Sequence, residues 1–261
     1  MSPARARAAQ PDEIYERARE EGKRRLSRPL LELAATALVG GFDVAFGVVA
    51  YALAAGELSG TGAARLAGAL AFGIGFVFVV VGKSELFTEN FLVPIAGMDG
   101  RRRSWLKLAE LWSATLALNL VGGTMLALIL TSRGVLPGES HGQLVELADT
   151  LAGYGVLTSF LSAVIAGALM TLMTWFVEGA AESMGVRIVM SWVVGALIVL
   201  GTFNHAVLST IELVFGMRYD AAVTTVDLLR NLGLAVAGNL AGGLLLVTFA
   251  RSAQALAGSR W

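Results

Sequence analysis

The chain has 261 residues, of which 56% are hydrophobic and 15% are charged, and its mean hydropathy is +0.68. Soluble domains average about 25% charged residues, so this composition excludes an ordinary soluble protein and indicates a membrane protein. The formal net charge is zero, which gives no basic field for a nucleic-acid partner. Cysteine is absent, which excludes disulfides, thiolate metal sites and a cysteine nucleophile.

The first 28 residues form a charged segment that precedes the first long apolar run. Acidic residues come first and basic residues follow: Asp12, Glu13, Glu16 and Glu20, then Lys23, Arg24, Arg25 and Arg28. This order favours a surface helix on the cytoplasmic side, and a disordered charged tail is the alternative. No short apolar core follows the first positive charges, so we do not expect a cleaved signal peptide.

Six apolar stretches follow, each long enough to cross roughly 30 Å of hydrocarbon at about 1.5 Å per residue. The predicted spans are 31–55, 66–96, 106–130, 157–177, 188–216 and 231–250. We expect the connection 134–149 to be an acidic outer loop. The predicted domains are a charged segment 1–28, a six-span transport domain 29–252 and a cytoplasmic tail 253–261.

Basic residues set the predicted orientation. Most of the 20 lysines and arginines lie in the N-terminal segment, the 97–107 loop, the tail and Arg187. Because cytoplasmic loops are enriched in lysine and arginine, these parts should face the cytoplasm. We therefore expect a multi-pass protein of the plasma (inner) membrane of a prokaryote, with both termini cytoplasmic.

The second and fifth spans are each interrupted by polar residues beside a glycine. The second carries Lys83, Glu85 and Glu89 at membrane depth, where each charge would cost roughly 2.5 to 3.5 kcal/mol against lipid. The fifth carries Gly201-Thr202-Phe203-Asn204-His205 inside the otherwise uncharged run from Ile188 to Ile211. These groups should therefore face protein, a cavity or water, and both helices should be broken there.

The two halves of the chain share a motif that indicates an internal repeat. Asn119-Leu120-Val121-Gly122-Gly123 in the third span matches Asn239-Leu240-Ala241-Gly242-Gly243 in the sixth. Three-span halves in tandem insert with opposite orientations, so the predicted fold is all-α, with six transmembrane helices in an inverted 3+3 repeat. Broken helices at matching positions point to a solute pathway near the midplane.

On these residues the chain resembles the formate/nitrite transporter family over nearly all of residues 30–250. Glu85-Leu86-Phe87-Thr88 is similar to the family's first break, Gly201-x-Phe203-x-His205 to its second, and Asn119 and Asn239 to its asparagines. The resemblance implies an aquaporin-like protomer, a homopentamer, and a path for small monovalent anions such as formate, nitrite or hydrosulfide. It also implies a constriction of Leu86, Phe87 and Thr88 near His205.

Several positions depart from the family pattern and look more like the YfdC-like branch. The position where the family usually has a basic residue, near the start of the fourth span, falls near Gly155. Thr171 replaces an asparagine of the same span. Asn204 replaces the acidic residue before the histidine, and Ser209 replaces a later asparagine. Glu89 and Lys83 are unusual charges. These departures leave the choice of substrate open.

The candidate pathway residues follow from the breaks and from the resemblance: Lys83, Leu86, Phe87, Thr88, Glu89, Asn119, Thr171, Thr202, Phe203, Asn204, His205 and Asn239. An unperturbed histidine titrates near pH 6.5 and burial disfavours its charged form, so His205 should be mostly neutral. It can then donate to an anion or hand over a proton. We hypothesise that a weak-acid anion loses water at the constriction, is stabilised by half-helix N-termini and His205, and crosses at least partly as the neutral acid.

Structural alternatives accompany these assignments. His205 could be a packed core histidine, and Phe87 and Phe203 could pack rather than gate. Lys83, Glu85 and Glu89 could form a structural network, most naturally with Asp43, whereas the functional alternative makes Lys83 the anion-attracting charge missing near Gly155. The two asparagines should bond to backbone freed at the breaks, and His141 should be solvated.

No metal-ligand spacing, serine nucleophile elbow or phosphate-binding glycine loop is present, so neither an enzyme nor a cofactor is expected. The expected partners are a small monovalent anion or its conjugate acid, the lipid bilayer and further copies of the chain, with no nucleic acid. Two rival functions remain: a channel for a small neutral solute, and a non-conducting scaffold or sensor that binds a partner through its N-terminal helix.

Overall fold

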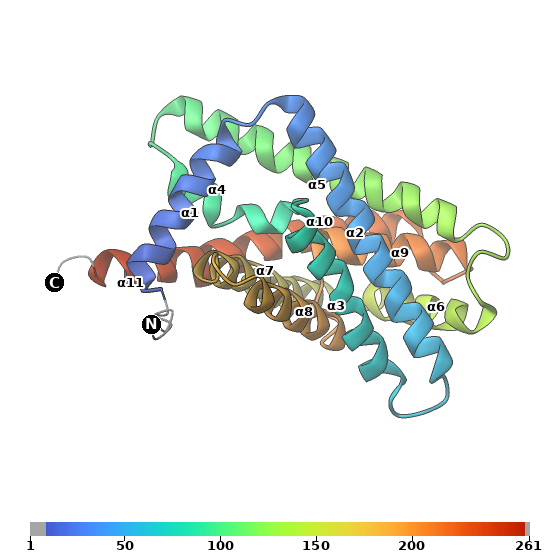
Figure 1. Ribbon diagram of the computed structural model, residues 1–261. Coiled ribbons are helices and arrows are strands. Elements are labelled where there is room, and N and C mark those ends of the chain that lie inside the picture. Colours follow the sequence, from blue (N-terminus) through green and yellow to red (C-terminus); the bar gives the residue numbers. More distant parts are fainter. Residues whose placement is uncertain (1–8, 259–261) are drawn as a thin grey trace, which may run out of the picture.

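The structure, a computed structural model, describes residues 9–258, and the regular elements in that range are all helices (Figure 1). Residues 1–8 and 259–261, which belong to the predicted terminal segments 1–28 and 253–261, lie outside the described part. The elements in chain order are α1 Pro11–Leu26, α2 Leu30–Glu57, α3 Ala64–Gly82, the 3-10 turn η1 Phe87–Asn90, α4 Val93–Gly97, α5 Arg102–Leu130, α6 Gly138–Ala152, α7 Val156–Gly179, α8 Met184–Leu200, α9 Ala206–Arg218, α10 Thr225–Ala241, the π-helical segment η2 Gly242–Thr248, and α11 Phe249–Gly258.

Five helical stretches in the described chain are long and apolar enough to cross a membrane, namely α2, α3, α5, α7 and the continuous stretch Thr225–Ala257. The apolar helix α8 is shorter, and together with α9 it forms the interrupted fifth span that the sequence predicts. The second predicted span is likewise divided, into α3, η1 and α4. The last helix continues to Gly258, so the predicted boundary between residues 252 and 253 falls inside α11.

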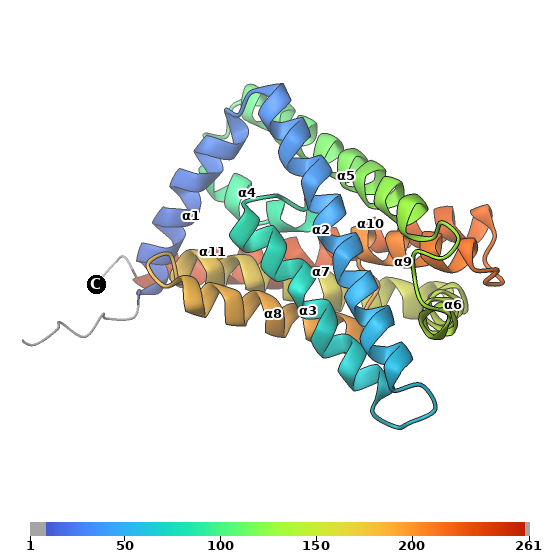
Figure 2. The same ribbon diagram turned by 45° about the vertical axis from the view of Figure 1, so that its right-hand side comes forward.

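In the described part of the N-terminal segment, residues Pro11–Leu26 form an ordered helix, so the alternative of a disordered tail is wrong for this part. Helix α1 packs on α4, α7 and α11 and forms an inverted V with α2 (Figure 2). Gly22 lets the backbones approach, because a Cβ at this position would collide with the carbonyl oxygen of Val93. Two arginines at the C-terminal end of α1 and just after it, Arg25 and Arg28, point into the protein rather than to the surface.

The connection 134–149 is mostly helical, which corrects the predicted loop. Helix α6 packs on α9 and α2 through buried residues spaced three and four apart: Leu144, Leu147, Ala148 and Leu151. This spacing places them on one face of a helix. His141 is not simply solvated, since its ring stacks on Tyr219 with centroids 3.9 Å apart. The acidic residues of this segment led to the prediction of a loop, whereas the spacing of its apolar residues indicates a helix.

The two halves pack in matching ways, as the repeated motif predicts. In the first half, Gly41 on α2 lies against Asn119 on α5, and in the second half Gly167 on α7 lies against Asn239 on α10. At each position a Cβ would collide with the carbonyl oxygen of the asparagine. The helices α2 and α5, and likewise α7 and α10, therefore cross at backbone contact, which only glycine permits.

Candidate solute pathway

Each break begins with a residue in the left-handed backbone region. These residues are Lys83, with φ of 61°, and Thr202, with φ of 48°. The sequence predicts the breaks beside Gly82 and Gly201, and the structure moves the irregular backbone one residue further along. Gly201 itself is right-handed, with φ of −78°. Non-glycine residues in this region cost about 1 to 3 kcal/mol, so the surrounding contacts must hold them in place.

Asn119 anchors the first break. Its side-chain oxygen accepts a hydrogen bond of 2.9 Å from the backbone N–H of Phe87. Its amide nitrogen donates to the carbonyl oxygens of Ala37, at 2.7 Å, and Glu85, at 2.9 Å. One buried side chain thus satisfies three backbone groups, two of which the break leaves without helical partners.

Asn239 does the same for the second break. It accepts from the backbone N–H of Ala206 at 2.9 Å, and it donates to the carbonyl oxygens of Ala163, at 2.8 Å, and Asn204, at 3.0 Å. The two asparagines therefore play equivalent parts in the two halves, as expected of residues that bond to freed backbone.

Thr88 and His205 meet where the two breaks converge, although they are 117 residues apart in the chain. The Nδ1 of His205 accepts a hydrogen bond of 3.0 Å from the backbone N–H of Leu208 and so caps α9. Nδ1 therefore carries no proton, and the neutral ring holds its proton on Nε2, which lies 2.7 Å from the Thr88 hydroxyl oxygen. His205 is the donor in this pair, which leaves the hydroxyl hydrogen of Thr88 free to donate elsewhere.

Apolar side chains enclose this pair. Leu86 and Phe87, which directly precede Thr88 in the chain, are buried. Phe76 of α3 lies on another side, with its ring centroid 6.1 Å from that of His205. Phe203 is half-buried and folds back over Gly201. Phe76 lies inside an uninterrupted apolar run, so the sequence pattern does not distinguish it from its neighbours.

The amide groups at the start of α9 are used inside the protein. The N–H of His205 donates to the Ser209 hydroxyl at 3.0 Å, that of Ala206 to Asn239, and that of Leu208 to the histidine ring. The half-helix can therefore favour an anion through its dipole, whereas these three amides are not free to bind one.

A charged cavity of about 240 Å³ opens beside α1 and ends at the first break. We call it the α1-face cavity, and its charged lining residues are Glu21, Arg24, Arg25, Arg28, Lys83, Glu85, Glu89, Glu178 and Arg187. Lys83 is exposed and stands at the mouth of the first break. Basic groups of this kind raise the local concentration of anions.

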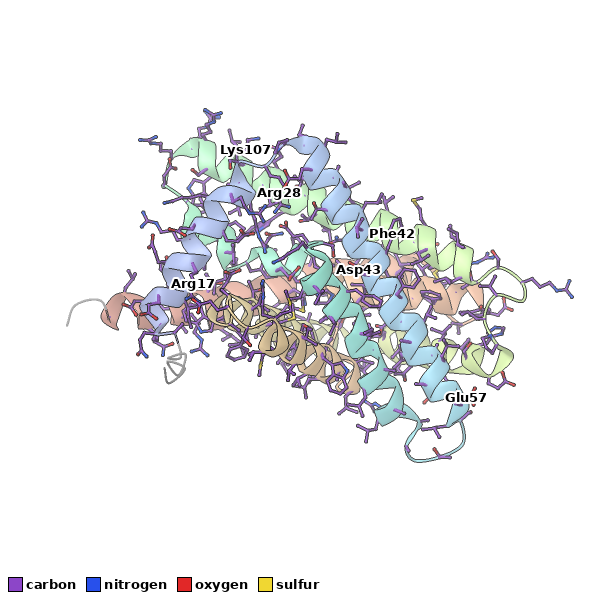
Figure 3. The ribbon with its side chains drawn as sticks, viewed as in Figure 1. Arg17, Arg28, Phe42, Asp43, Glu57 and Lys107 are labelled. Atoms are coloured by element: carbon purple, nitrogen blue, oxygen red, sulfur yellow. The ribbon has the colours of Figure 1, made fainter. Side chains whose placement is uncertain are left out.

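Glu85 pairs with arginines of the N-terminal segment and not with Asp43. Arg28 Nη1 lies 2.5 Å from Glu85 Oε2, and Arg25 Nη1 lies 3.5 Å from Glu85 Oε1. Arg28 lies at the junction of α1 and α2 (Figure 3), and only 4% of its side chain is exposed. Asp43 instead accepts a hydrogen bond of 2.5 Å from Ser84.

Glu89 is bound locally, because its Oε2 accepts a hydrogen bond of 2.9 Å from the backbone N–H of Leu86. The expected network of Lys83, Glu85, Glu89 and Asp43 therefore does not form as a unit. Among the described residues, no ion pair within 4.0 Å includes Lys83. This leaves its ammonium group available in the cavity.

The charge of Glu21 on α1 is insensitive to pH near neutrality. Burial alone would raise the pKa of Glu21, but the hydrogen bond from Arg24 and the charge of Arg25 outweigh it and lower the pKa to about 2. Glu21 therefore stays ionised at any physiological pH. A change in activity between pH 5.5 and 7.5 must arise from another group.

A second cavity, of about 230 Å³, opens beside α6 and ends at the second break. This α6-face cavity is lined by polar residues that include Tyr51, Arg65, Glu146 and Thr202. Arg65 donates to the carbonyl oxygen of Leu200 at 2.5 Å and to the Thr202 hydroxyl at 3.1 Å. Arg65 thus supplies a positive charge on the side where Gly155 lacks one.

The remaining candidates lie in the walls that hold the breaks. Asn204 donates to Ser159 at 2.8 Å and to Asn231 at 2.9 Å, and so ties the second break to α7 and α10. Thr171 donates to the carbonyl oxygen of Gly167 on its own helix. The structure thus brings Thr88 and His205 together, with Leu86 and Phe87 buried beside them, and places Lys83 and Glu89 on one side and Thr202 on the other.

The sequence of the chain matches those of known proteins over most of its length. The family model for the formate/nitrite transporter matches residues 12–253. The inner membrane protein YfdC of Escherichia coli (strain K12) is 26% identical over 257 residues, which cover 97% of this chain and 79% of YfdC.

Two solved structures are similar in fold. An FNT family ion channel superposes with a TM-score of 0.78 at 18% identity, covering 92% of this chain and 98% of the other. A pentameric formate channel with formate bound superposes with a TM-score of 0.74 at 20% identity, covering 87% and 97%. The family consists of transporters and channels rather than enzymes. The chain therefore belongs to the formate/nitrite transporter family.

Proposed function

We propose that this protein carries formate, or a similarly small monovalent anion of a weak acid, across the inner membrane of a prokaryote. The proposal rests on one observation: two charged cavities end at the two breaks, and the breaks meet at the buried pair of Thr88 and His205. The family and the formate-bound structural relative support formate as the first candidate. We further propose a homopentamer with the α1 face and both termini in the cytoplasm.

The proposed recognition group at the constriction is the Thr88 hydroxyl. Since it accepts from His205 Nε2, its own hydrogen points away from the ring and can donate to an anion oxygen. The buried side chains of Leu86 and Phe87 exclude ions that cannot shed their water there. His205 then acts through Thr88, by holding the hydroxyl in a donating orientation.

Uptake by proteoliposomes tests this function. Formate, nitrite, hydrosulfide, acetate and uncharged urea are offered at pH 5.5 and pH 7.5 to the wild type, His205→Ala and Thr88→Val. We expect saturable formate uptake that is faster at pH 5.5 and that both variants lower by roughly 10-fold or more, because a hydrogen bond to a charged group contributes about 1.5 to 3 kcal/mol. Thr88→Ser, which keeps the hydroxyl, is the matched control and should retain most of the flux.

The rival functions predict different results in the same experiment. Preferential uptake of urea would indicate a channel for neutral solutes. No flux of any solute from an assembled protein would favour the scaffold or sensor, in which α1 binds a cytoplasmic partner. An unchanged flux in both His205→Ala and Thr88→Val would show that the pair is not the constriction.

Lys83→Met tests whether the unpaired lysine attracts the anion. We expect the variant to assemble normally and to lower formate flux severalfold at low salt, with the difference shrinking at high salt because salt screens exposed charges. Lys107→Met, at a partly exposed lysine that pairs with Glu110 outside both cavities, is the control and should leave the flux unchanged. Loss of the oligomer in Lys83→Met would instead indicate a structural role.

A further inference from the structure

Glu212 on α9 differs from the other buried acidic side chains of the described chain. Glu85, Glu89 and Glu212 are exposed by only 2%, 7% and 4%. Glu85 pairs with two arginines, and Glu89 accepts from a backbone N–H. Among the described residues, Glu212 has neither an ion pair within 4.0 Å nor a backbone donor, and its polar neighbour is the Ser209 hydroxyl.

Glu212 lies on the same face of α9 as the constriction histidine. Positions 205, 209 and 212 are four and three residues apart, a spacing that places side chains in one row on a helix. The row is joined at its start, since the N–H of His205 donates to the Ser209 hydroxyl at 3.0 Å. Seven residues of helix correspond to about 10 Å, so Glu212 lies one step from His205 toward α6.

Glu212 lies near the α6-face cavity, behind residues that line it. Tyr51 of α2 lies close enough for its charge to interact with that of Glu212, and Tyr51 lines that cavity. Other titratable groups around this point are Tyr154, Glu146 and Arg65. A carboxyl group here lies between the cavity-lining Tyr51 and the helix start at His205, so a proton needs to pass only one further side chain to reach the cavity.

The contacts of His205 make it a poor proton acceptor. Nδ1 is occupied by the Leu208 N–H and Nε2 points at Thr88, so protonating the neutral ring would require the loss of the helix cap. An ionised carboxylate without a partner is costly at membrane depth, whereas the protonated acid is not. Glu212 is therefore the group beside the pathway that can take up and release a proton without the loss of a helix cap or an ion pair.

We propose that Glu212 is the proton-binding residue of the pathway, so that formate and a proton cross together. This rests on the proposed function. The protonated Glu212 gives its proton to a formate ion that lies beside it, which yields formic acid and the Glu212 carboxylate. Water of the α6-face cavity then returns a proton to the carboxylate. In the opposite direction the same steps run in reverse.

The test measures formate uptake and internal acidification together in proteoliposomes whose membrane potential is set by potassium and valinomycin. In the wild type, uptake should carry protons inward and be nearly independent of the potential, because no net charge moves. Glu212→Gln should still carry formate, but as the anion, so uptake should lose its acidification and fall at least about 5-fold when the inside is negative. Glu139→Gln, an exposed carboxylate on α6, is the control and should behave as the wild type.

Each result decides the matter. Potential-independent uptake with full acidification in Glu212→Gln would overturn the proposal, while absence of formate uptake in the wild type would overturn the proposed function instead. If Glu212→Gln does not assemble, dicyclohexylcarbodiimide, which reacts with protonated carboxyls in apolar surroundings, is applied to the wild type. Modification at Glu212 that lowers uptake and is reduced by formate supports the proposal. An unmodified Glu212, or unaffected uptake, overturns it.

Discussion

Replacing Arg28 by methionine is expected to destabilise the protein by about 3 to 5 kcal/mol, because the substitution leaves a buried carboxylate without its closest partner. Arg28 and Glu85 are exposed by only 4% and 2%, and their closest atoms are 2.5 Å apart. Methionine keeps much of the apolar stem, so the loss reports the charge rather than a cavity. Thermal unfolding in detergent measures it as a lower midpoint and a smaller fraction of assembled protein.

The double variant Arg28→Met/Glu85→Gln separates charge from packing. Removal of both charges should recover most of the lost stability, because a buried pair contributes less than the penalty for breaking it. Arg19→Met is the control, since 48% of the Arg19 side chain is exposed and its partner Glu16 is 54% exposed. Purely additive losses in the double variant would contradict the assignment of this pair.

Valine at Gly41 or at Gly167 is expected to prevent assembly of a stable protein. At each position the new side chain would collide with the carbonyl oxygen of the asparagine that anchors a break. Overpacking costs about 1 to 3 kcal/mol where side chains can move, and backbone contact leaves less room to yield. The measurement is the yield of monodisperse protein in size-exclusion chromatography after mild detergent extraction.

The inverted repeat predicts similar losses for the two valine variants, because the two crossings are equivalent. Gly185→Val is the control, since a Cβ at this helical position has no neighbour within 4 Å. Normal yield of Gly41→Val together with loss of Gly167→Val would show that the halves do not depend on their crossings in the same way.

The sequence predicts the broken spans and the asparagines that anchor them, because the cost of placing a charge against lipid can be recognised from a few neighbouring residues. Charges at Lys83 and Glu85 cannot face lipid, and the repeated motif places Asn119 and Asn239 at matching positions. The meeting of Thr88 with His205, in contrast, was expected only from the family resemblance. Hydropathy does not specify which buried side chains touch across 117 residues of chain.

Other features depend on tertiary contacts that no local pattern carries. The pairing of Arg28 with Glu85 depends on how α1 folds back over the first break. The left-handed residues are Lys83 and Thr202 rather than the adjacent glycines, because the turn is imposed by its surroundings. Glu212 could have been found from the sequence, since it is a lone carboxylate in an apolar segment.

The hydrogen bonds of the two asparagines also bear on how the chain folds during synthesis. Those of Asn119 reach back at most 82 residues, to Ala37, and those of Asn239 at most 76, to Ala163. Each half can therefore fix its own break soon after it leaves the ribosome, since nearer contacts cost less loop-closure entropy. The hydrogen bond between Thr88 and His205 can form only after both halves have been synthesised. The proposed constriction should therefore form late, when the two breaks pack against each other.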